Sequence, residues 1–343
     1  MTADTAPAEP RWPALPVAPG SALDAAGAIA FGTYQGRTDA IDYAPIGAGR
    51  WPRRWRHKRW QYVSIAGPEV VLAVAVVDLG WAASSFAYLF DRTGRRLLAD
   101  LDVVAPRRHV AVAAASGGAV LTTFRSSKLH VRLVGSGDGR WRLEARSPQL
   151  TIDASLSETS AGPTLCAVAP VPGGVVDCTH KTPALHVDGV AAAGGALFDL
   201  GSCHGALDHT DGILARATTW RWASATNGTV ALNLTEGFTA PYENALWVAG
   251  DIRSLGPVHF ELDRTQLDAP WRVTSMSAPG AHERDREHEV DLEFLPEGAR
   301  RKDSALIVAS SHYVQPVGRW RGTVAGVRID ELVGVAEDHS ARW

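Results

Sequence analysis

The amino-acid chain consists largely of short segments in which apolar and polar residues alternate. The segments RWRLEAR and LTIDASLS alternate with a period of two, which in a strand places one face on a core and the other in water. Segments such as RTGRR and GSGDG, rich in turn-forming Gly and Asp residues, interrupt the alternation. This pattern predicts antiparallel strands joined by tight turns, as in a β-sandwich or a β-barrel.

The pattern recurs in both halves of the chain, and no helical period of useful length lies between the expected strands. Parallel βαβ units are therefore not expected, and the predicted fold class is all-β with few short helices. Only Ser21 to Ala30 suits a short helix. The expected strands are QYVSI, VVLAVAVVDLG, SSFAYLFD, HVAVAAA, AVLTTF, LHVRLV, RWRLEAR and LTIDASLS, then TTWRWASA, TVALNLTEG, ALWVAGDI, VHFELD, WRVTSM, VDLEFLPEG, ALIVASSHYV and RWRGTVAGVRI.

A chain of 343 residues can hold two antiparallel barrels or one large assembly of strongly bent sheets. The segment from Val176 to Gly195, with its Gly and Ala residues, is the expected join. We therefore expect a disordered tail over residues 1–20, an N-terminal β-barrel-like domain over residues 21–185 and a C-terminal β-barrel domain over residues 186–343.

The stretch WPRRWRHKRWQY at residues 51–62 mixes tryptophans with basic residues, a composition that suits single-stranded nucleic acids. The whole chain has a net charge of −3, however, whereas proteins that bind nucleic acids usually have a basic excess. No nucleic-acid partner is therefore expected. The alternative is a structural lead-in to the first strands, with Trp60 and Tyr62 buried and the arginines solvated.

The three cysteines, Cys166, Cys178 and Cys203, cannot all pair and form no Cys-x-x-Cys motif, so free thiols in a reducing compartment are expected. The N-terminal residues have no basic region followed by an apolar one, which argues against a signal peptide. The longest apolar run, Val70 to Val77, is too short to span a bilayer. We expect a soluble cytoplasmic protein, and the sequence does not indicate its oligomeric state.

The densest polar cluster is CHGALDHTDG, which holds His204, Asp208, His209 and Asp211. A carboxyl group in an apolar pocket loses hydration, so its pKa rises and it can act as an acid. Asp208 is the candidate acid and His209 its candidate partner in proton transfer, with a turn-capping Asp208 as the alternative. No His-x-His or His-Glu-x-x-His spacing occurs, so no metal site is expected.

Aromatic and charged residues elsewhere are candidates for contacts to a substrate. Trp220 and Trp222 follow the polar cluster and share parity in an expected strand, so both indoles should face a cavity. These indoles could stabilise a developing cation, or they could simply fill a core. Glu243 is a further candidate catalytic carboxylate, with a turn anchor as the alternative. The remaining candidate substrate-binding residues are Arg216, Arg221, Tyr242, Trp247, His180 and Lys181.

Several stretches together resemble the DUF2804 family. They are RHKRWQYVSI, DLGWAASSFAYLFDR, THK, ALDHTDGILARATTWRWASA, ENALW, APWRV, FLPEG and the terminal GVAEDHSARW. More distantly, the chain resembles lipocalin-like proteins of the carotenoid hydratase and AttH kind, which implies two calycin-type, lipocalin-like β-barrels. In this resemblance Asp208 and His209 match an Asp-His pair that precedes a Trp-x-Trp strand. The resemblance also implies that the chain end, with Trp343, is ordered and packs on the barrel.

No Gly-x-Gly-x-x-Gly loop, Walker lysine or Gly-x-Ser-x-Gly elbow is present, so no cofactor is expected. The resemblance implies a barrel cavity that binds an apolar or amphipathic small molecule. The first hypothesis is a cofactor-independent acid–base enzyme of the hydratase, cyclase or isomerase type acting on such a molecule. A non-catalytic carrier of a lipid or pigment is the second, and a carbohydrate-active or carbohydrate-binding protein is the third.

Overall fold

The computed structural model of the chain describes residues 11–50, 53–114, 119–159, 162–276, 289–305 and 310–343. In these residues the regular structure is almost entirely β-strand, with the short helical turns η1 (Ala44–Ile46), α1 (Arg53–Arg56) and η2 (Arg107–His109). The strands of the first sheet are β1 (Gly32–Gln35), β2 (His57–Ala66), β3 (Val70–Asp78), β4 (Ala82–Asp91), β5 (Arg96–Pro106), β6 (Val110–Ala111), β7 (Ala119–Arg125), β8 (His130–Ser136), β9 (Arg140–Arg146), β10 (Leu150–Ser157), β11 (Leu165–Pro170), β12 (Val176–Ala193), β13 (Ala196–Asp199) and β14 (His204–Ile213). The strands of the second sheet are β15 (Ala217–Thr226), β16 (Val230–Gly237), β17 (Ala245–Val248), β18 (Asp251–Ser254), β19 (Val258–Glu261), β20 (Trp271–Ser275), β21 (Val290–Ala305), β22 (Ser310–Val324) and β23 (Val327–Arg342).

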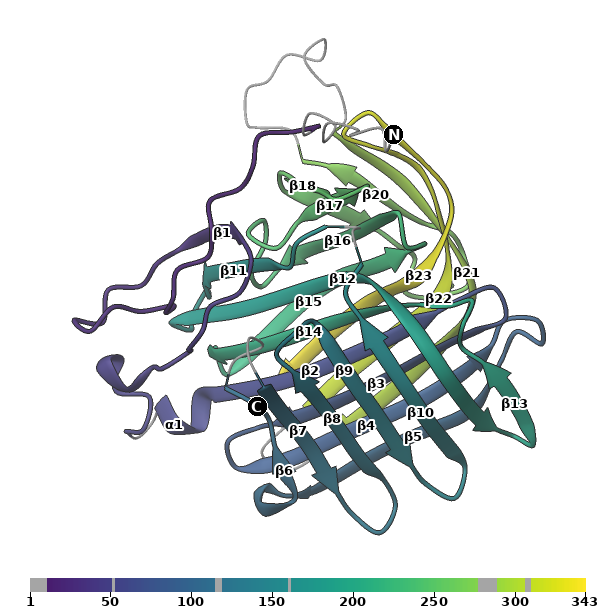
Figure 1. Cartoon of the computed structure of the whole chain (residues 1–343), viewed down its shortest axis with the longest axis horizontal. Helices are drawn as coiled ribbons and strands as arrows, with labels where there is room; N and C mark the ends of the chain where they lie inside the picture. The colour runs from purple at the N-terminus through teal and green to yellow at the C-terminus, as the bar shows by residue number, and fades with distance from the viewer. Residues whose placement is uncertain (1–10, 51–52, 115–118, 160–161, 277–288, 306–309) are drawn as a thin grey trace, which may run out of the picture.

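The two sheets are antiparallel and strongly curled, and they pack against each other (Figure 1). Neighbours in the first sheet follow the order β5-β4-β3-β2-β14-β12-β10-β9-β8-β7-β6, with β1, β11 and β13 paired at its side. The second sheet has the order β18-β17-β16-β15-β23-β22-β21-β20-β19. The predicted all-β fold of bent antiparallel sheets is therefore confirmed.

Each sheet curls one of its faces around a hydrophobic core. Val63 and Leu143 belong to the core of the first sheet, and Leu234 and Trp271 belong to the core of the second. Tyr62, the neighbour of Val63 in β2, points to the opposite face because side chains alternate along a strand. A further cluster lies there, between the two sheets, and includes Tyr62, Ala75, Tyr88, Trp222, Val317 and Val335. The interior of each curled sheet is thus filled, and the space for a ligand lies between the sheets.

A β-bulge bends the long strands of the second sheet. The pairing of β22 with β23 shifts register between Trp320 and Gly322. Gly322 has a φ angle of +132°, and a Cβ atom there would lie 2.2 Å from the carbonyl oxygen of Asp291. Gly322 therefore permits the close approach of β22 to β21, and the extra residue, which lies in β23, increases the local twist of that strand.

The change from one sheet to the other falls between Ile213, the end of β14, and Ala217, the start of β15. The predicted boundary between residues 185 and 186 instead lies inside β12, which pairs with β10, β11, β13 and β14. Gly189 of the predicted join serves close packing, because a Cβ atom there would lie 2.2 Å from the carbonyl oxygen of Asp153. A composition typical of a linker was therefore misread, since it belongs to a central strand.

The segment before β1 makes specific contacts where the structure describes it. Trp12 packs against the core of the second sheet, and the guanidinium groups of Arg11 and Arg253 lie 5.7 and 5.9 Å from its ring centroid. Residues 11–20 therefore differ from the predicted disordered tail, while residues 1–10 lie outside the described part of the chain.

The predicted short helix at Ser21 to Ala30 is a turn. The carboxylate of Asp24 accepts hydrogen bonds from the backbone N–H groups of Ala26 and Ala28 at 2.9 and 2.8 Å. An aspartate that binds the backbone two residues ahead favours a turn over a helix, and this contact explains the difference.

The basic stretch at residues 51–62 leads into β2, as predicted, although residues 51–52 lie outside the described part. Tyr62 is buried, and Trp60 is half-buried. Two of the arginines are exposed, but Arg56 is half-buried and its Nε donates to the carbonyl oxygen of Leu214 at 2.7 Å. Arg56 therefore anchors the start of the sheet.

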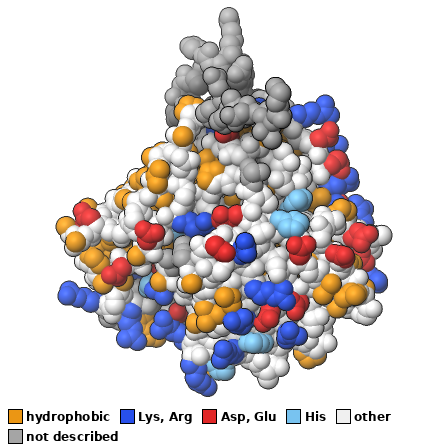
Figure 2. All heavy atoms as spheres, viewed as in Figure 1, with side chains coloured by type: hydrophobic (Ala, Val, Ile, Leu, Met, Phe, Trp, Pro, Cys, Tyr) orange, Lys and Arg blue, Asp and Glu red, His pale blue; other side chains and the backbone are white. Residues whose placement is uncertain are grey.

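The surface seen in Figure 2 has Lys and Arg side chains lying among Asp and Glu side chains. This distribution agrees with the net charge of −3. Among the residues that the structure describes, no helix has the length and apolar character needed to cross a membrane. The cytoplasmic location stays a prediction.

Candidate functional site

One wall of the candidate site is a row of side chains that crosses the first sheet. Residues directly opposite each other in neighbouring antiparallel strands share a face, so the register places their side chains side by side. The row runs across β12, β14, β2, β3, β4 and β5 as Lys181, Asp208, Tyr62, Ala75, Phe86 and Asp102. Asp208 therefore lies in the middle of a strand, and it is not a turn cap.

The opposing wall comes from the second sheet. In one row Glu337 of β23 lies opposite Trp222 of β15, which in turn lies opposite Thr235 of β16. In the next row His339 lies opposite Trp220. Both indoles face the same side, as their parity in the sequence predicts.

The two walls enclose a pocket of about 120 Å³ between the sheets. The predicted residues Asp208, Lys181, Glu243, Trp220 and Trp222 all line it. The other lining residues are Trp60, Tyr62, Ala75, Val77, Phe86, Asp177, Thr210, Thr235, Phe238, Tyr313, Glu337, His339 and Trp343. The pocket is thus largely aromatic with a few buried polar groups, as is typical of a site for a small molecule.

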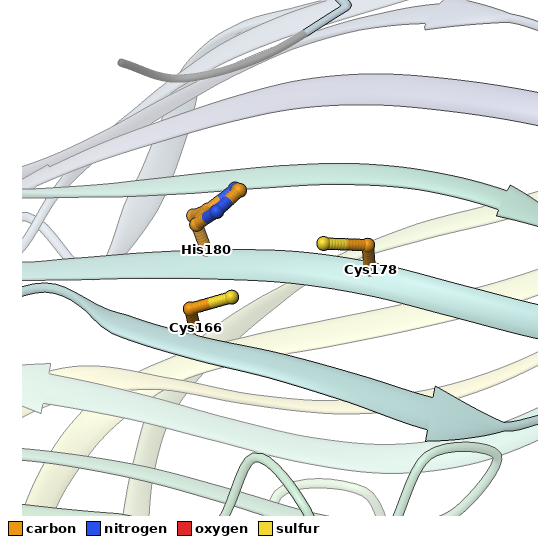
Figure 3. A group of neighbouring side chains, drawn as sticks. All are labelled: Cys166, Cys178 and His180. Atoms are coloured by element: carbon orange, nitrogen blue, oxygen red, sulfur yellow. The ribbon is translucent and has the colours of Figure 1, made fainter. Parts of the chain in front are cut away.

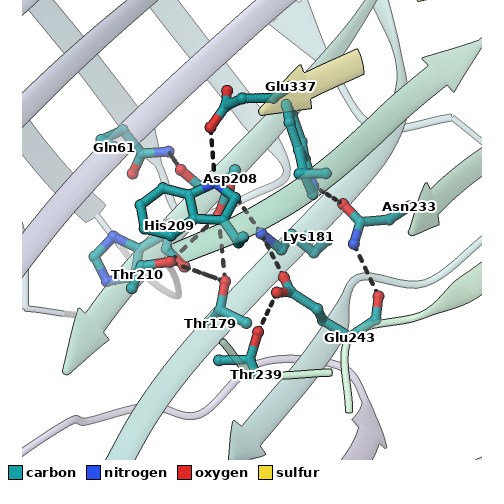
Figure 4. A network of polar contacts seen from close by, with 12 residues as sticks. Gln61, Thr179, Lys181, Asp208, His209, Thr210, Asn233, Thr239, Glu243 and Glu337 are labelled. Atoms are coloured by element: carbon teal, nitrogen blue, oxygen red, sulfur yellow. Dashed lines mark hydrogen bonds and ion pairs between the residues drawn. The ribbon is translucent and has the colours of Figure 1, made fainter. Parts of the chain in front are cut away.

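Lys181 joins the half-buried carboxylate of Asp208 and the buried carboxylate of Glu243 at one side of the pocket (Figure 4). Its Nζ lies 2.7 Å from Oδ2 of Asp208 and 2.7 Å from Oε2 of Glu243. Thr179 donates to Oδ1 of Asp208 at 3.2 Å, and the hydroxyl of Thr239 donates to Glu243. One cation therefore serves two carboxylates, and their orientations are fixed by neighbouring hydroxyl groups.

Burial and charge act in opposite directions on this cluster. Burial raises the pKa of Asp208 above its ordinary value, although the ammonium group of Lys181 opposes the rise. Burial alone would lower the pKa of Lys181, but the charges of Asp208 and Glu243 outweigh it and raise that pKa. Lys181 is therefore positively charged throughout the physiological range, and it favours the charged form of Asp208.

Glu337 is a second kind of carboxyl group in the same pocket, because no cation contacts it in the described part of the chain. Trp220 Nε1 donates to its Oε1 at 2.7 Å, and Gln315 Nε2 donates to its Oε2 at 2.8 Å. Burial raises the pKa of Glu337 to about 7, and the charge of Asp208 adds to the rise. A group of this kind is partly protonated near neutral pH and can both give and take a proton.

His209 and His180 do not contact the pocket. Each is one residue away from a pocket-lining residue in its strand, so its ring points to the opposite face of the sheet. The two rings stack there with centroids 5.9 Å apart, and burial lowers the pKa of His209 to about 4. The predicted pairing of Asp208 with His209 is therefore wrong, because adjacent residues in a strand face opposite ways.

The other candidate substrate-binding residues lie outside this pocket. Trp247 is buried against Pro163, to whose carbonyl oxygen its Nε1 donates at 2.8 Å, and it lines a smaller neighbouring pocket. Arg221 points away from the pocket and bonds Glu236 at 2.8 Å, and Arg216 is exposed. The last candidate, Tyr242, is half-buried and packs in the cluster that contains Trp247.

Glu337 and Tyr313 are pocket residues that the sequence reasoning did not assign to a site. A signal for Glu337 was available, because Glu337, His339 and Ala341 alternate with a period of two in the closing segment. The chain end is ordered and packed, as expected, since Trp343 lines the pocket and its Nε1 donates to Thr218 Oγ1 at 3.0 Å. Tyr313 gives no such signal, because its place opposite His339 depends on the pairing of β22 with β23.

A group that could hold a metal ion lies on the opposite face of the first sheet (Figure 3). Potential ligand atoms of Cys166, Cys178 and His180 lie within 4.8 Å of one another, and all three residues are buried. The backbone N–H of Thr38 donates to Nε2 of His180 at 3.1 Å, so this ring nitrogen is already engaged within the protein. The group belongs to the packed layer under the N-terminal segment, and we assign it no part in the pocket.

The fold and the pocket define a class: an all-β protein of two curled antiparallel sheets with buried carboxyl groups in an aromatic pocket between them. The chain belongs to the DUF2804 family, described as a domain of unknown function, whose sequence pattern matches residues 16–343. The resemblance noted in the sequence is therefore confirmed. A comparison with curated protein sequences found no significant match.

Solved structures that resemble the chain include the following two. An AttH-type protein from Nitrosomonas europaea is 15% identical with a TM-score of 0.56, and the match covers 84% of this chain and 95% of that chain. Kievitone hydratase from Nectria haematococca is 11% identical with a TM-score of 0.47, over 83% of this chain and 88% of that chain. The first similarity shows that the two-sheet fold is shared with an AttH-type protein.

Proposed function

We propose that the protein is a cofactor-independent acid–base enzyme that adds water to, or removes water from, an apolar unsaturated small molecule. One observation supports this proposal above all. Two carboxyl groups, the half-buried Asp208 and the buried Glu337, face the same aromatic pocket, and of these two only Asp208 has a cationic partner. Paired carboxyl groups whose surroundings separate their pKa values are the usual basis for an acid and a base in one site.

In the direction of hydration, the protonated carboxyl group of Glu337 is the acid. It transfers its proton to one carbon of a carbon–carbon double bond, and a cation develops on the other carbon. The indoles of Trp60, Trp220 and Trp222 line the pocket and would stabilise this cation through their negative ring faces. A pKa of about 7 leaves a usable fraction of Glu337 protonated at neutral pH.

Asp208 is the base in this scheme, although the sequence suggested it as the acid. The ammonium group of Lys181 at 2.7 Å favours its carboxylate form, which can take a proton from the attacking water. The oxygen of that water bonds to the carbon cation, and its proton passes to Asp208. Return of the proton from Asp208 to Glu337 restores the starting state, and the reverse sequence removes water from the alcohol.

The alternative functions are less well supported by the pocket. A passive carrier needs no titratable groups in its cavity, yet this pocket contains several buried carboxyl groups. A glycosidase needs two carboxyl groups that act separately on opposite sides of a sugar. Asp208 and Glu243 instead share one ammonium group, that of Lys181.

The proposal is tested by incubating the protein in isotopically labelled water with a panel of unsaturated terpenes and the matching tertiary alcohols. Mass spectrometry follows the gain or loss of one water molecule. We expect conversion of at least one compound, and a fall of about 100-fold in rate for Glu337→Gln and for Asp208→Asn. The control is Glu261→Gln, which changes an exposed carboxyl group of β19 in the same way and should leave the rate unaltered.

Two results would contradict the proposal. If compounds bind in the pocket and none is converted, the protein is a carrier. If conversion occurs and both carboxyl variants keep the rate of the unaltered protein, the reaction does not use Asp208 and Glu337.

A further inference from the structure

Asp177 on β12 and Thr235 on β16 are among the polar side chains that line the pocket and have no role in the reaction proposed above. Both are 1% exposed. Within the described residues, the two carboxyl oxygens of Asp177 have no hydrogen-bond partner. The hydroxyl group of Thr235 has none either. A buried polar group without a partner is costly, and a ligand that supplies the missing partner removes this cost.

A glycine in the neighbouring strand leaves space for the unpartnered carboxyl group of Asp177. Asp177 lies opposite Gly212 in the pairing of β12 with β14. A Cβ atom on Gly212 would lie 2.3 Å from Oδ1 of Asp177, so any larger residue would collide with the carboxyl group. The carboxyl group is therefore held beside bare backbone, with its oxygens free for a partner in the pocket.

The nearby cations do not neutralise Asp177. Lys181 lies two residues further along β12, but its ammonium group is held by Asp208 and Glu243. Lys58, which lies opposite Gly212 in β2, directs its ammonium group to the backbone. Burial raises the pKa of Asp177 well above its ordinary value, and the charge of Glu243 adds to the rise. Burial therefore favours the protonated form of the Asp177 carboxyl group, and that form can both donate and accept a hydrogen bond.

We propose that Asp177 and Thr235 recognise a neutral oxygen substituent of the ligand, and that the ligand is an apolar molecule carrying a hydroxyl group. A hydroxyl group both donates and accepts, so it complements a neutral carboxyl group and a threonine hydroxyl. An anionic ligand is disfavoured, because the one pocket lysine already serves two carboxylates. This inference rests on the pocket of the proposed function and defines its substrate class as an oxygenated apolar molecule.

The test compares three probes that share one ring system: 2-naphthol, naphthalene and 2-naphthylmethylammonium. Equilibrium dialysis at neutral pH measures the dissociation constant of each for the whole protein. We expect 2-naphthol to bind about tenfold more tightly than naphthalene, the gain expected for filling one unsatisfied hydrogen-bonding site. The preference should fall to below about threefold in Asp177→Leu and in Thr235→Val, and Asp177→Asn should keep most of it because the amide still donates and accepts.

Circular dichroism confirms that each variant is folded, and Thr235→Val, which keeps the side-chain shape, decides the question if Asp177→Leu does not fold. Glu261→Gln is the control and should leave all three constants unchanged. The inference is overturned by equal binding of 2-naphthol and naphthalene, by tighter binding of the ammonium probe, by no binding of any probe, or by an unchanged preference in Thr235→Val. Because dialysis does not depend on turnover, a missing reaction would remove the proposed function and leave this result intact.

Discussion

Glu337 shows, at the scale of one residue, how burial alters the chemistry of a side chain. Its carboxyl group is contacted by the indole of Trp220 and the amide of Gln315, and no cation compensates for the loss of water. Burial therefore raises its pKa from the ordinary value of 4.5 to about 7. In the unfolded chain the same group keeps its ordinary pKa. At pH values between 4.5 and about 7 the folded and unfolded states therefore bind different numbers of protons.

This difference predicts a pH dependence of stability. The folded protein holds the proton of Glu337 up to a pH of about 7, so the free energy of unfolding should decrease as the pH rises from 4.5 to about 7. In Glu337→Gln this contribution is absent. Urea unfolding of both proteins at several pH values measures the free energy of unfolding. Over this pH range it should decrease by about 3 kcal/mol more in the unaltered protein than in Glu337→Gln.

The control for this measurement is Glu261→Gln, whose exposed carboxyl group lies on β19 away from the pocket. Its pH profile should match that of the unaltered protein. Parallel profiles for the unaltered protein and Glu337→Gln would show that Glu337 titrates normally in the folded state, and its role as an acid would then be lost.

The sequence predicted single residues well where side-chain parity alone decides their direction. Trp220 and Trp222 share parity and share a face, and Asp208 lies in the same pocket. The prediction for His209 was wrong because proximity in sequence was taken for proximity in space. Residues such as Tyr313 could not be found, because their neighbours are set by the pairing of strands distant in sequence.

β23 and β15 carry Glu337 and the two indoles, and their close approach depends on a glycine. A Cβ atom on Gly334 would lie 2.2 Å from the carbonyl oxygen of Ser224 in β15. Gly334→Ala should therefore lower the free energy of unfolding by about 1–3 kcal/mol, as overpacking does. Urea unfolding measures the change, and Gly49→Ala is the matched control because no atom lies within 4 Å of its added Cβ. Equal stability of the two variants would mean that the strands can separate without cost.

The lead-in to β2 provides a second test at the scale of an element. Arg56 Nε donates to the carbonyl oxygen of Leu214 at 2.7 Å, and its guanidinium group also reaches the carbonyl oxygen of Gly173. Arg56→Ala should lower the free energy of unfolding by about 2 kcal/mol, because hydrogen bonds from a charged group are lost. Arg54→Ala, which removes an exposed guanidinium group, should change it by less than about 0.5 kcal/mol. If Arg56→Ala left the free energy of unfolding unchanged, this contact would not hold the start of the sheet.

Strands with clean alternation, such as β9 and β10, were predicted from the sequence with the bounds that the structure shows. β12 was not, because it is buried on both faces and carries polar residues toward the pocket, so its sequence does not alternate. Its Pro183 and Gly189 also resemble a linker. Strands that form a site therefore deviate most from the pattern that identifies strands.

The three cysteines give a prediction for the molecule as a whole. Cys166, Cys178 and Cys203 are all unpaired and buried. Thiol titration of the denatured, unreduced protein should count three free groups, and the folded protein should react far more slowly because the thiols are shielded. A count of one after denaturation would reveal a disulfide and would contradict the predicted reducing compartment.

The pocket exists only when both sheets are complete and docked. Its walls combine Tyr62 and Asp208 of the first sheet with Trp222 and Glu337 of the second. A molecule bound there binds the folded chain and not the unfolded one, so it raises the stability of the entire protein by mass action, by about 2.7 kcal/mol at a hundred times its dissociation constant. The melting temperature therefore reports occupancy of this pocket, and thermal denaturation in the presence of a compound library can find the natural ligand before its reaction is known.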